Sequence, residues 1–146
     1  MFLKEDPVAE RDIVLGVDLD EVVFNYLGFV REKLVAAGRQ LPDGPPNSWS
    51  LPDAGWFKDD ADFFKFHGNL VEEGLYDKLE LLPGAHETLW DLSNSGYMLN
   101  VITSRFVNHG QHQKVCKQTV VALDANGIPY NNLSFFKQGG YVPYLI

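Results

Sequence analysis

The chain has 146 residues, the size of one domain or of a domain with a small insertion, and it is long enough to bury a hydrophobic core. Its 12 Lys and Arg residues against 20 Asp and Glu residues give a formal net charge of −8, which disfavours binding to nucleic acid polymers. A single cysteine excludes an intrachain disulfide and fits a reduced, cytoplasmic location. No stretch approaches the roughly 18 apolar residues of a membrane span.

The first half of the chain predicts one strand followed by helices and a loop. Residues 13–17 form a short β-branched run that is typical of a strand buried on both faces of a parallel sheet. Apolar residues at helical spacing predict a helix over 21–38. Residues 40–53, rich in Pro, Gly, Ser and Asn, predict a loop, and the aromatic and acidic stretch 56–76 predicts one or two short helices.

The second half predicts helices and strands in alternation. The expected elements are a helix over 83–95, a strand over 99–102, a helix over 112–126, a strand over 133–136, a turn at Gly139-Gly140 and the start of a fourth strand over 142–146. The expected apolar faces are Leu89, Trp90 and Leu92 in the first helix, and Val115, Val120, Val121 and Leu123 in the second. Alternating strands and helices predict an α/β fold with a parallel sheet.

Polar side chains follow three of the predicted strands. Asp18 and Asp20 follow the first, Thr103 and Ser104 the second, and Lys137 the third. Ligands of parallel sheets bind at the carboxyl ends of the strands, so these groups are expected to converge in one crevice. Paired carboxylates suit Mg²⁺. One carboxylate could attack phosphorus while the other moves a proton, and the hydroxyls and the ammonium could hold the phosphate oxygens.

Each of these features also has a simpler interpretation. The two aspartates are typical of a helix cap or a loop, and Thr103-Ser104 could cap the next helix. Lys137 could be a solvated surface lysine. Their placement at three successive strand ends favours a shared site, because one physical purpose explains the whole arrangement.

The same residues resemble the motifs of a known enzyme superfamily. Residues 14–23, VLGVDLDEVV, resemble the first motif of the haloacid-dehalogenase-like (HAD) phosphatases, and residues 101–105, VITSR, resemble the second. Lys137 stands where the third motif is expected, and Leu82-Pro83-Gly84-Ala85 before a helix resembles the usual return to the core. Within the superfamily the chain resembles the 5′(3′)-deoxyribonucleotidases and their bacterial and phage relatives over nearly its whole length.

The resemblance implies a fold and a role for each site residue. It implies a Rossmann-like HAD core over 1–23 and 83–146, with a small helical cap inserted over 24–82. Asp18 would be the nucleophile that forms an aspartyl-phosphate, and Asp20 the general acid and base. Mg²⁺ would be held by the Asp18 carboxylate and the main-chain carbonyl of Asp20.

The remaining roles concern the phosphate and the base. Thr103 and Ser104 would bind the phosphate, and Lys137 would orient the nucleophile and neutralise charge. In the deoxyribonucleotidases the cap supplies aromatic side chains that sandwich the base, and Tyr26 matches the position of one of them. Further aromatic residues of the cap have no clear match and are more simply explained as core: Trp49, Trp56, Phe57, Phe63 and Phe64.

The family's fourth motif is an acidic pair that follows a fourth strand and completes the magnesium site. Counting from Lys137 places this pair just past Ile146, so we expect that the chain stops short of it and binds Mg²⁺ weakly. An uncovered edge of the first strand would then favour a homodimer.

The sequence thus favours a Mg²⁺-dependent phosphomonoesterase that hydrolyses (deoxy)nucleoside monophosphates. Two alternatives stay open: a HAD phosphatase of another small phosphate ester, and a catalytically inactive HAD-like fragment retained as a binding domain. A response-regulator receiver domain is disfavoured, because the stretch between Asp18 and Pro83 is far longer than a βα loop and a helix.

Overall fold

The computed structural model describes residues 13–105, 110–137 and 140–141, which form two compact units. The first unit contains the sheet and takes residues 13–24, 81–105 and those from 123 onward. The second unit contains residues 25–80 and 110–122. Each unit has its own buried apolar residues.

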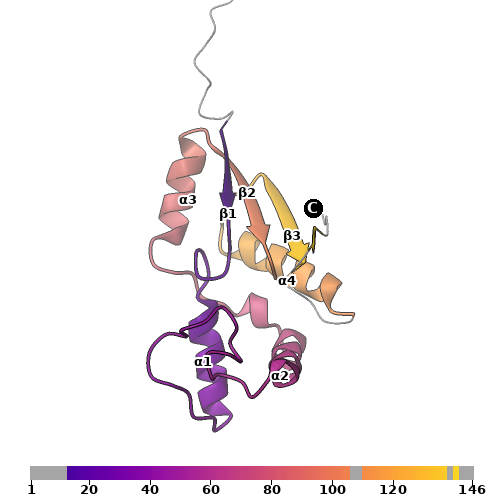
Figure 1. Cartoon of the computed structure of the whole chain (residues 1–146). Helices are drawn as coiled ribbons and strands as arrows, with labels where there is room; N and C mark the ends of the chain where they lie inside the picture. The colour runs from indigo at the N-terminus through magenta and orange to yellow at the C-terminus, as the bar shows by residue number, and fades with distance from the viewer. Residues whose placement is uncertain (1–12, 106–109, 138–139, 142–146) are drawn as a thin grey trace, which may run out of the picture. The chain divides into compact units, whose positions relative to one another are not determined.

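The first unit is built on a mainly parallel sheet. Its strands are β1 (Val14–Val17), β2 (Met98–Thr103), β3 (Asn132–Lys137) and β4 (Gly140–Tyr141), in the order β1-β2-β3-β4. The first three strands are parallel, and their arrows in Figure 1 point the same way, whereas β4 pairs with β3 in the antiparallel sense. The predicted α/β fold with a parallel sheet is therefore confirmed, and the carboxyl ends of β1, β2 and β3 share one edge.

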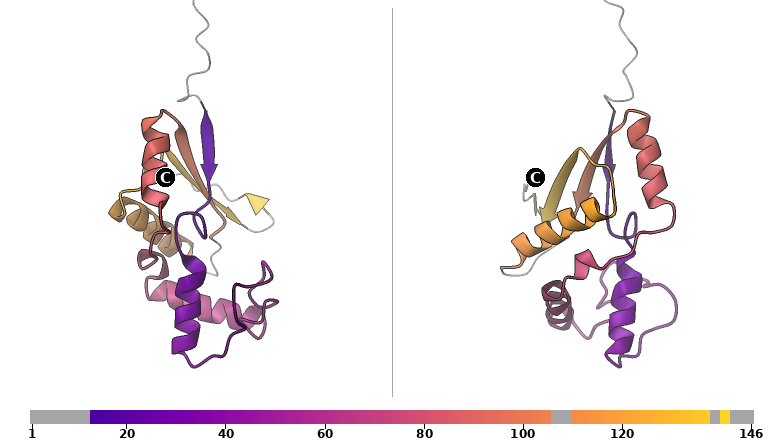
Figure 2. Two further views of the ribbon diagram at one scale, coloured as in Figure 1. Left: turned by 90° about the vertical axis from the view of Figure 1, so that its left-hand side faces the viewer. Right: turned by 180° about the vertical axis from the view of Figure 1, so that it is seen from behind.

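Side chains alternate between the two faces of this sheet. One face is buried and includes Leu99 and Val101 of β2 and Leu133 and Phe135 of β3. Helix α3 (Ala85–Asn94) lies beside β1 and β2 in all three views of Figures 1 and 2, and it buries Ala85 and Leu89. The parallel pairing of β1 with β2 and of β2 with β3 sets the register that aligns their carboxyl ends.

The other face of the sheet reaches solvent, so the prediction that residues 13–17 are buried on both faces is wrong. Val14 is 51% exposed and Ile102 is 40% exposed. Both lie on the face opposite to Leu99 and Val101, because successive side chains of a strand point to opposite sides. Gly16 lies on this second face as well, where a Cβ atom would come within 3.1 Å of the Cδ1 atom of Ile102.

The second unit is helical. Its elements are α1 (Tyr26–Ala36), α2 (Asp60–Glu72), the 3₁₀ helix η2 (Leu75–Asp77), and α4 (His112–Ala125) as far as Ala122. The side chain of Asn25 caps α1 by accepting the Gly28 N–H, and Asp59 caps α2 by accepting the Asp62 N–H. The predicted loop over 40–53 and the short helices of 56–76 are confirmed.

The helix predicted from residue 21 begins instead at Tyr26. The carbonyl of Leu19 accepts the N–H groups of Val22, Val23 and Phe24 at 3.3, 2.8 and 2.9 Å, which folds the chain after β1 into a tight loop. Three N–H groups share this one carbonyl, so the chain closes a single loop here and does not continue as regular helix turns; α1 begins after Asn25, which caps it.

The two ends of the stretch between β1 and α3 lie next to each other. The N–H of Asn25 donates to the Glu80 carbonyl at 2.8 Å, and the N–H of Leu82 donates to the Val23 carbonyl at 2.8 Å. We call these two hydrogen bonds the neck. The assignment of 1–23 and 83–146 to a core and of 24–82 to a cap stays a prediction, since residues 110–122 cluster with 25–80.

Three further expectations need correction, and a fourth lies outside the described residues. Trp90 was expected on a buried face but is 40% exposed, and its indole N–H donates to the Gly127 carbonyl at 2.7 Å. Val121 was expected inward but is 46% exposed. Gly140, expected in a turn, lies in β4 opposite Lys137. The fourth strand expected over 142–146 falls outside the described residues.

Helices α3 and α4 confirm the predictions over 83–95 and 112–126, with Leu89, Val115 and Leu123 buried as expected. Among the described helices, none combines the length and the apolar composition that crossing a bilayer requires.

Candidate active site

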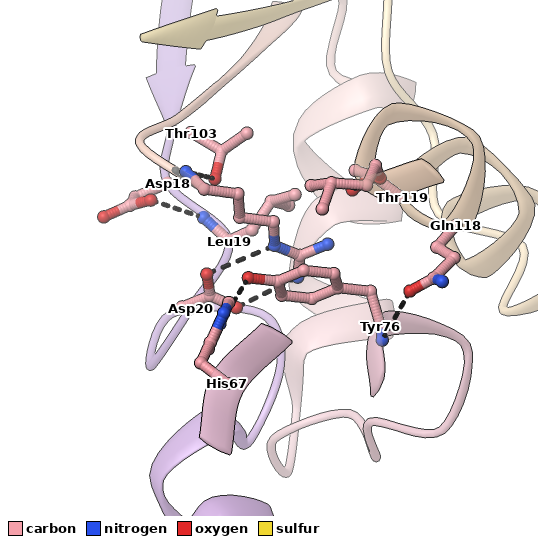
Figure 3. Close-up of polar contacts among 10 residues, drawn as sticks. Asp18, Leu19, Asp20, His67, Tyr76, Thr103, Gln118 and Thr119 are labelled. Atoms are coloured by element: carbon pink, nitrogen blue, oxygen red, sulfur yellow. Dashed lines mark hydrogen bonds and ion pairs between the residues drawn. The ribbon is translucent and has the colours of Figure 1, made fainter. Parts of the chain in front are cut away.

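Asp18 lies directly after β1, at the carboxyl edge of the sheet. Its side chain is exposed, and its Oδ1 atom accepts the N–H of Leu19 at 2.8 Å (Figure 3). The chain then turns sharply, with Glu21 at a φ of 63°, a left-handed conformation that few residues other than glycine adopt. This turn brings Asp20 back beside the strand ends instead of letting a helix carry it away.

The surroundings of Asp18 disfavour its negative charge. Neighbouring protein atoms displace part of its hydration, and this desolvation is the largest cause that raises the pKa of its carboxyl above the ordinary value of 3.8. The hydrogen bond from Leu19 opposes the rise, repulsion by Asp20 adds to it, and attraction by Arg105 opposes it. A cation or an electrophile placed against this carboxylate would relieve the cost.

Asp20 is held by an arginine from the end of β2. The Nε of Arg105 donates to Oδ2 of Asp20 at 3.2 Å, and its Nη2 donates to Oδ1 at 2.9 Å; Figure 3 marks both contacts at Asp20. The side chain of Arg105 is 0% exposed, whereas that of Asp20 is 26% exposed. The guanidinium carbon also lies 5.4 Å from the ring centroid of Phe24.

The hydroxyl residues after β2 differ in exposure. Thr103 is 1% exposed, and its Oγ1 atom accepts the backbone N–H of Arg105 at 3.3 Å. Ser104 is exposed. Thr103 therefore shapes the turn at the end of β2, and Ser104 presents its hydroxyl to solvent at the same edge.

Lys137 ends β3, and the register of the strands places its backbone at this edge. Thr103 is paired with Phe135, so Lys137 lies two residues beyond the level of Thr103. The side chain of Lys137 lies outside the described part of the structure. The four strand-end residues with described side chains thus meet at one edge through β1 and β2: Asp18, Asp20, Thr103 and Ser104.

The oxygen atoms at the end of β1 suit a hard divalent cation. Carboxylate and carbonyl oxygens are the ligands that Mg²⁺ prefers. Both carboxylate oxygens of Asp20 already accept hydrogen bonds from Arg105, which leaves the Asp18 carboxylate and the main chain at Asp20 as the better donors. Within the described ranges there is no cluster of three or more His, Cys, Asp or Glu side chains able to hold a metal.

The second unit contains an aromatic cluster around His67. The imidazole Nε2 lies 3.2 Å from the hydroxyl of Tyr76, and the rings of Tyr26 and Phe63 lie 6.1 and 5.4 Å from the His67 ring. Gln118 fixes Tyr76 by accepting its backbone N–H at 3.2 Å; Figure 3 marks both polar contacts of Tyr76. Tyr26, the first residue of α1, therefore lies in this aromatic cluster.

The other candidate aromatics of this unit divide by burial. Trp56 and Phe57 are 3% and 5% exposed and belong to the core of the unit. Trp49 is fully exposed, Phe63 is half-buried, and Phe64 is 36% exposed.

Two residues of these clusters were not singled out by the sequence. Arg105 lies inside the second motif, but the motif predicts no function for it. Its position two residues after Thr103 is the sequence feature that places it near the site. His67 was isolated in the sequence, and its contact with Tyr76 depends on the fold.

Comparison with known proteins shows which family the chain belongs to. The model of the family described as "5' nucleotidase, deoxy (Pyrimidine), cytosolic type C protein" matches residues 11–142. A protein of Chlorobaculum tepidum named "Putative 5'(3')-deoxyribonucleotidase" is 33% identical over 140 residues, which cover 94% of this chain and 69% of that protein. No solved structure matches. The chain therefore belongs to the type C 5′-nucleotidase family, and it is a 5′-nucleotidase-like hydrolase with a HAD-type α/β core.

Proposed function

We propose that this chain is a Mg²⁺-dependent phosphatase of (deoxy)nucleoside monophosphates that works through an aspartyl-phosphate. The observation that carries the proposal is the pair of aspartates after β1, set beside the hydroxyls after β2 at the carboxyl edge of a parallel sheet. Family membership supplies the nucleotide class.

Asp18 is the proposed nucleophile. Leu19 holds one of its oxygens, and its side chain is open to solvent, so a phosphate ester can approach it. An Asp18 oxygen bonds to phosphorus as the bond from phosphorus to the ester oxygen breaks. Partial desolvation is the largest of the causes that raise the pKa of this carboxyl, and a cation bound beside it would favour its ionised, nucleophilic form.

Asp20 is the proposed general acid and base. Its carboxylate, paired with Arg105, first takes up a proton from solvent and then gives that proton to the departing ester oxygen as the ester bond breaks. In the second step it takes a proton from water, which attacks phosphorus, breaks its bond to Asp18 and releases inorganic phosphate. The proton that Asp20 gains in the second step is the one it gives to the ester oxygen of the next substrate.

Ser104, Thr103 and Lys137 are proposed to hold the phosphate. The exposed hydroxyl of Ser104 can donate to a phosphate oxygen directly. Thr103 keeps its own hydroxyl hydrogen for donation while its oxygen accepts from Arg105. Lys137 is proposed to add a positive charge from the end of β3.

Mg²⁺ would be held by the Asp18 carboxylate and the main-chain carbonyl of Asp20. When bound, the ion would neutralise charge on the phosphate oxygens. Two protein ligands leave most of an octahedral shell to water and substrate, so we propose that the described residues alone bind the ion weakly.

Tyr26 is proposed to stack on the nucleobase. A Tyr26→Ala variant should then raise KM for a deoxynucleoside monophosphate several-fold and leave kcat/KM for p-nitrophenyl phosphate unchanged, because the aryl ester has no base. Tyr26→Phe is the matched control and should behave as wild type. Equal losses on both esters would place Tyr26 in the core of its unit only. The homodimer and the cytoplasmic location stay predictions.

The decisive experiment compares Asp18→Asn with Asp20→Asn on p-nitrophenyl phosphate and on a deoxynucleoside monophosphate. Asp18→Asn should abolish turnover of both, because an amide is a poor nucleophile. Asp20→Asn should lose about 10²–10⁴-fold on the nucleotide and less on the aryl ester, whose leaving group needs no proton. Near-normal turnover by Asp18→Asn on either ester would eliminate the covalent mechanism.

Wild-type behaviour separates the alternatives. Hydrolysis of small phosphate esters with no activity on nucleotides would indicate a HAD phosphatase of another substrate. Absence of activity on every ester, in a folded sample with Mg²⁺, would indicate a binding domain without catalysis.

A further inference from the structure

Arg105 and Asp20 form a two-point ion pair at the strand ends. Two guanidinium nitrogens reach the two carboxylate oxygens, at 3.2 and 2.9 Å. We propose that Arg105 is a positioning residue that aims Asp20 for proton transfer, and this inference rests on the proposed function.

Arg105 is itself held by contacts with two other residues, so it fixes the orientation of the Asp20 side chain. Its backbone N–H donates to the hydroxyl oxygen of Thr103 at 3.3 Å. Its guanidinium carbon lies 5.4 Å from the ring centroid of Phe24, which ends the tight loop after Leu19. The arginine therefore connects the end of β2 with both sides of the loop that carries Asp20.

Burial of the Arg105 side chain does not by itself increase the stability of the fold. Its side chain is 0% exposed, and removing a guanidinium from water carries a large desolvation cost that an ion pair only balances. An apolar side chain of similar length would pack against Phe24 without that cost. The two contacts with Asp20 connect this buried charge to a proposed reacting group.

The geometry leaves Asp20 able to react. An ionised carboxylate has about four lone-pair positions, and a bidentate arginine takes one on each oxygen. The remaining lone pairs stay available on a side chain that is 26% exposed. Arg105 thus fixes the plane of the carboxylate without blocking proton transfer. Without this contact, the Asp20 side chain on its loop would have no fixed orientation for the transfer.

The chain offers a matched control pair in its other unit. Arg39 donates to Asp62 through Nη1 and Nη2 at 2.7 and 2.9 Å, and its guanidinium carbon lies 5.0 Å from the ring centroid of Phe66. This pair repeats the bidentate and aromatic contacts of Arg105, but it includes none of the proposed reacting groups.

The test measures kcat/KM for two esters with the full chain. Arg105→Met keeps the apolar stem and removes the charge; we expect a loss of about 10–100-fold on a deoxynucleoside monophosphate and less than about 3-fold on p-nitrophenyl phosphate. Arg105→Lys, the milder variant, should show the same pattern more weakly and serves if Arg105→Met does not fold. Arg39→Met should leave the ratio of the two values unchanged.

A double-variant cycle separates positioning from general structural support. If Arg105 acts through Asp20, then Arg105→Met should cost less than about 3-fold on the nucleotide when Asp20→Asn is already present. Equal losses on both esters, or the full loss repeated in the Asp20→Asn background, would overturn the inference. A wild-type chain inactive on both esters would overturn the proposed function itself, and the inference with it.

Discussion

The two aspartates of the site should differ sharply in what they contribute to stability. Replacing Asp20 by Asn removes the countercharge of Arg105, whose side chain is 0% exposed. Breaking a buried ion pair by removing one partner costs about 3–5 kcal/mol. Asp20 is 26% exposed, and the Asn carbonyl still accepts one hydrogen bond, so we expect a loss of about 2–3 kcal/mol for this variant.

Asp18→Asn should instead leave the free energy of unfolding within about 0.5 kcal/mol of wild type. The Asn Oδ1 atom can still accept the N–H of Leu19, so the loop keeps its hydrogen bond. The pKa of Asp18 is raised in the folded state, so its ionised form near pH 7 lowers stability relative to the unfolded chain. Removing the charge therefore shifts stability in the favourable direction.

The assay is urea and thermal unfolding at pH 7 of wild type, Asp18→Asn, Asp20→Asn and the control Asp62→Asn. Asp20→Asn should lower Tm by about 4–12 °C, from 2–4 °C per kcal/mol for a chain of this size. Asp62→Asn should lower it less, because its partner Arg39 is 34% exposed and keeps contact with water. Equal Tm values for Asp18→Asn and Asp20→Asn would refute the argument from the buried arginine.

Three other predictions follow from buried or paired groups. Leu99→Ala, at a fully buried position of β2, should lower the free energy of unfolding by about 2–5 kcal/mol in urea titrations, and a loss under 1 kcal/mol would contradict a packed sheet face. Hydrogen bonds, chiefly from Arg39 and then from the Lys58 N–H, hold the pKa of Asp62 below 3.8. The ionised carboxylate therefore stabilises the fold above pH 3.8, and this stabilisation is lost as the pH falls through the folded-state pKa. Asp62→Asn should make the free energy of unfolding depend less on pH in this acid range, and an unchanged pH dependence would contradict the pairing. Burial raises the pKa of the Cys116 thiol to about 11, so a thiol reagent at pH 8 should modify folded protein about 100-fold more slowly than urea-unfolded protein, and similar rates would show that α4 opens readily.

The sequence predicted the order of elements well because periodicity reports local burial. The parallel strands, α3 and α4 follow from β-branched runs and from apolar residues at helical spacing. Val14 and Ile102 show the limit of this reasoning: an apolar run records that a strand is hydrophobic, and the layers around it decide which face is covered.

The site was predictable where it depends on strand ends and less so where it depends on distant contacts. Asp18, Asp20, Thr103 and Ser104 follow β1 and β2 in sequence, so their common edge follows from a parallel sheet. The contact of Arg105 with Asp20 joins residues 85 positions apart, and it requires the tight loop after Leu19. Helical periodicity around Val22 hid that loop, since backbone hydrogen bonding to one carbonyl leaves no signature in residue type.

The neck has a consequence for how this fold tolerates change in length. Asn25 faces Glu80 and Val23 faces Leu82 through direct hydrogen bonds, so the polypeptide leaves the sheet-bearing unit and returns to it at neighbouring points. Lengthening or shortening the intervening stretch alters loop-closure entropy only slowly and leaves both anchor points where they are. Insertions or deletions between Asn25 and Glu80 are therefore expected to leave the strands in place, provided that they spare the contacts of this stretch with residues 110–122.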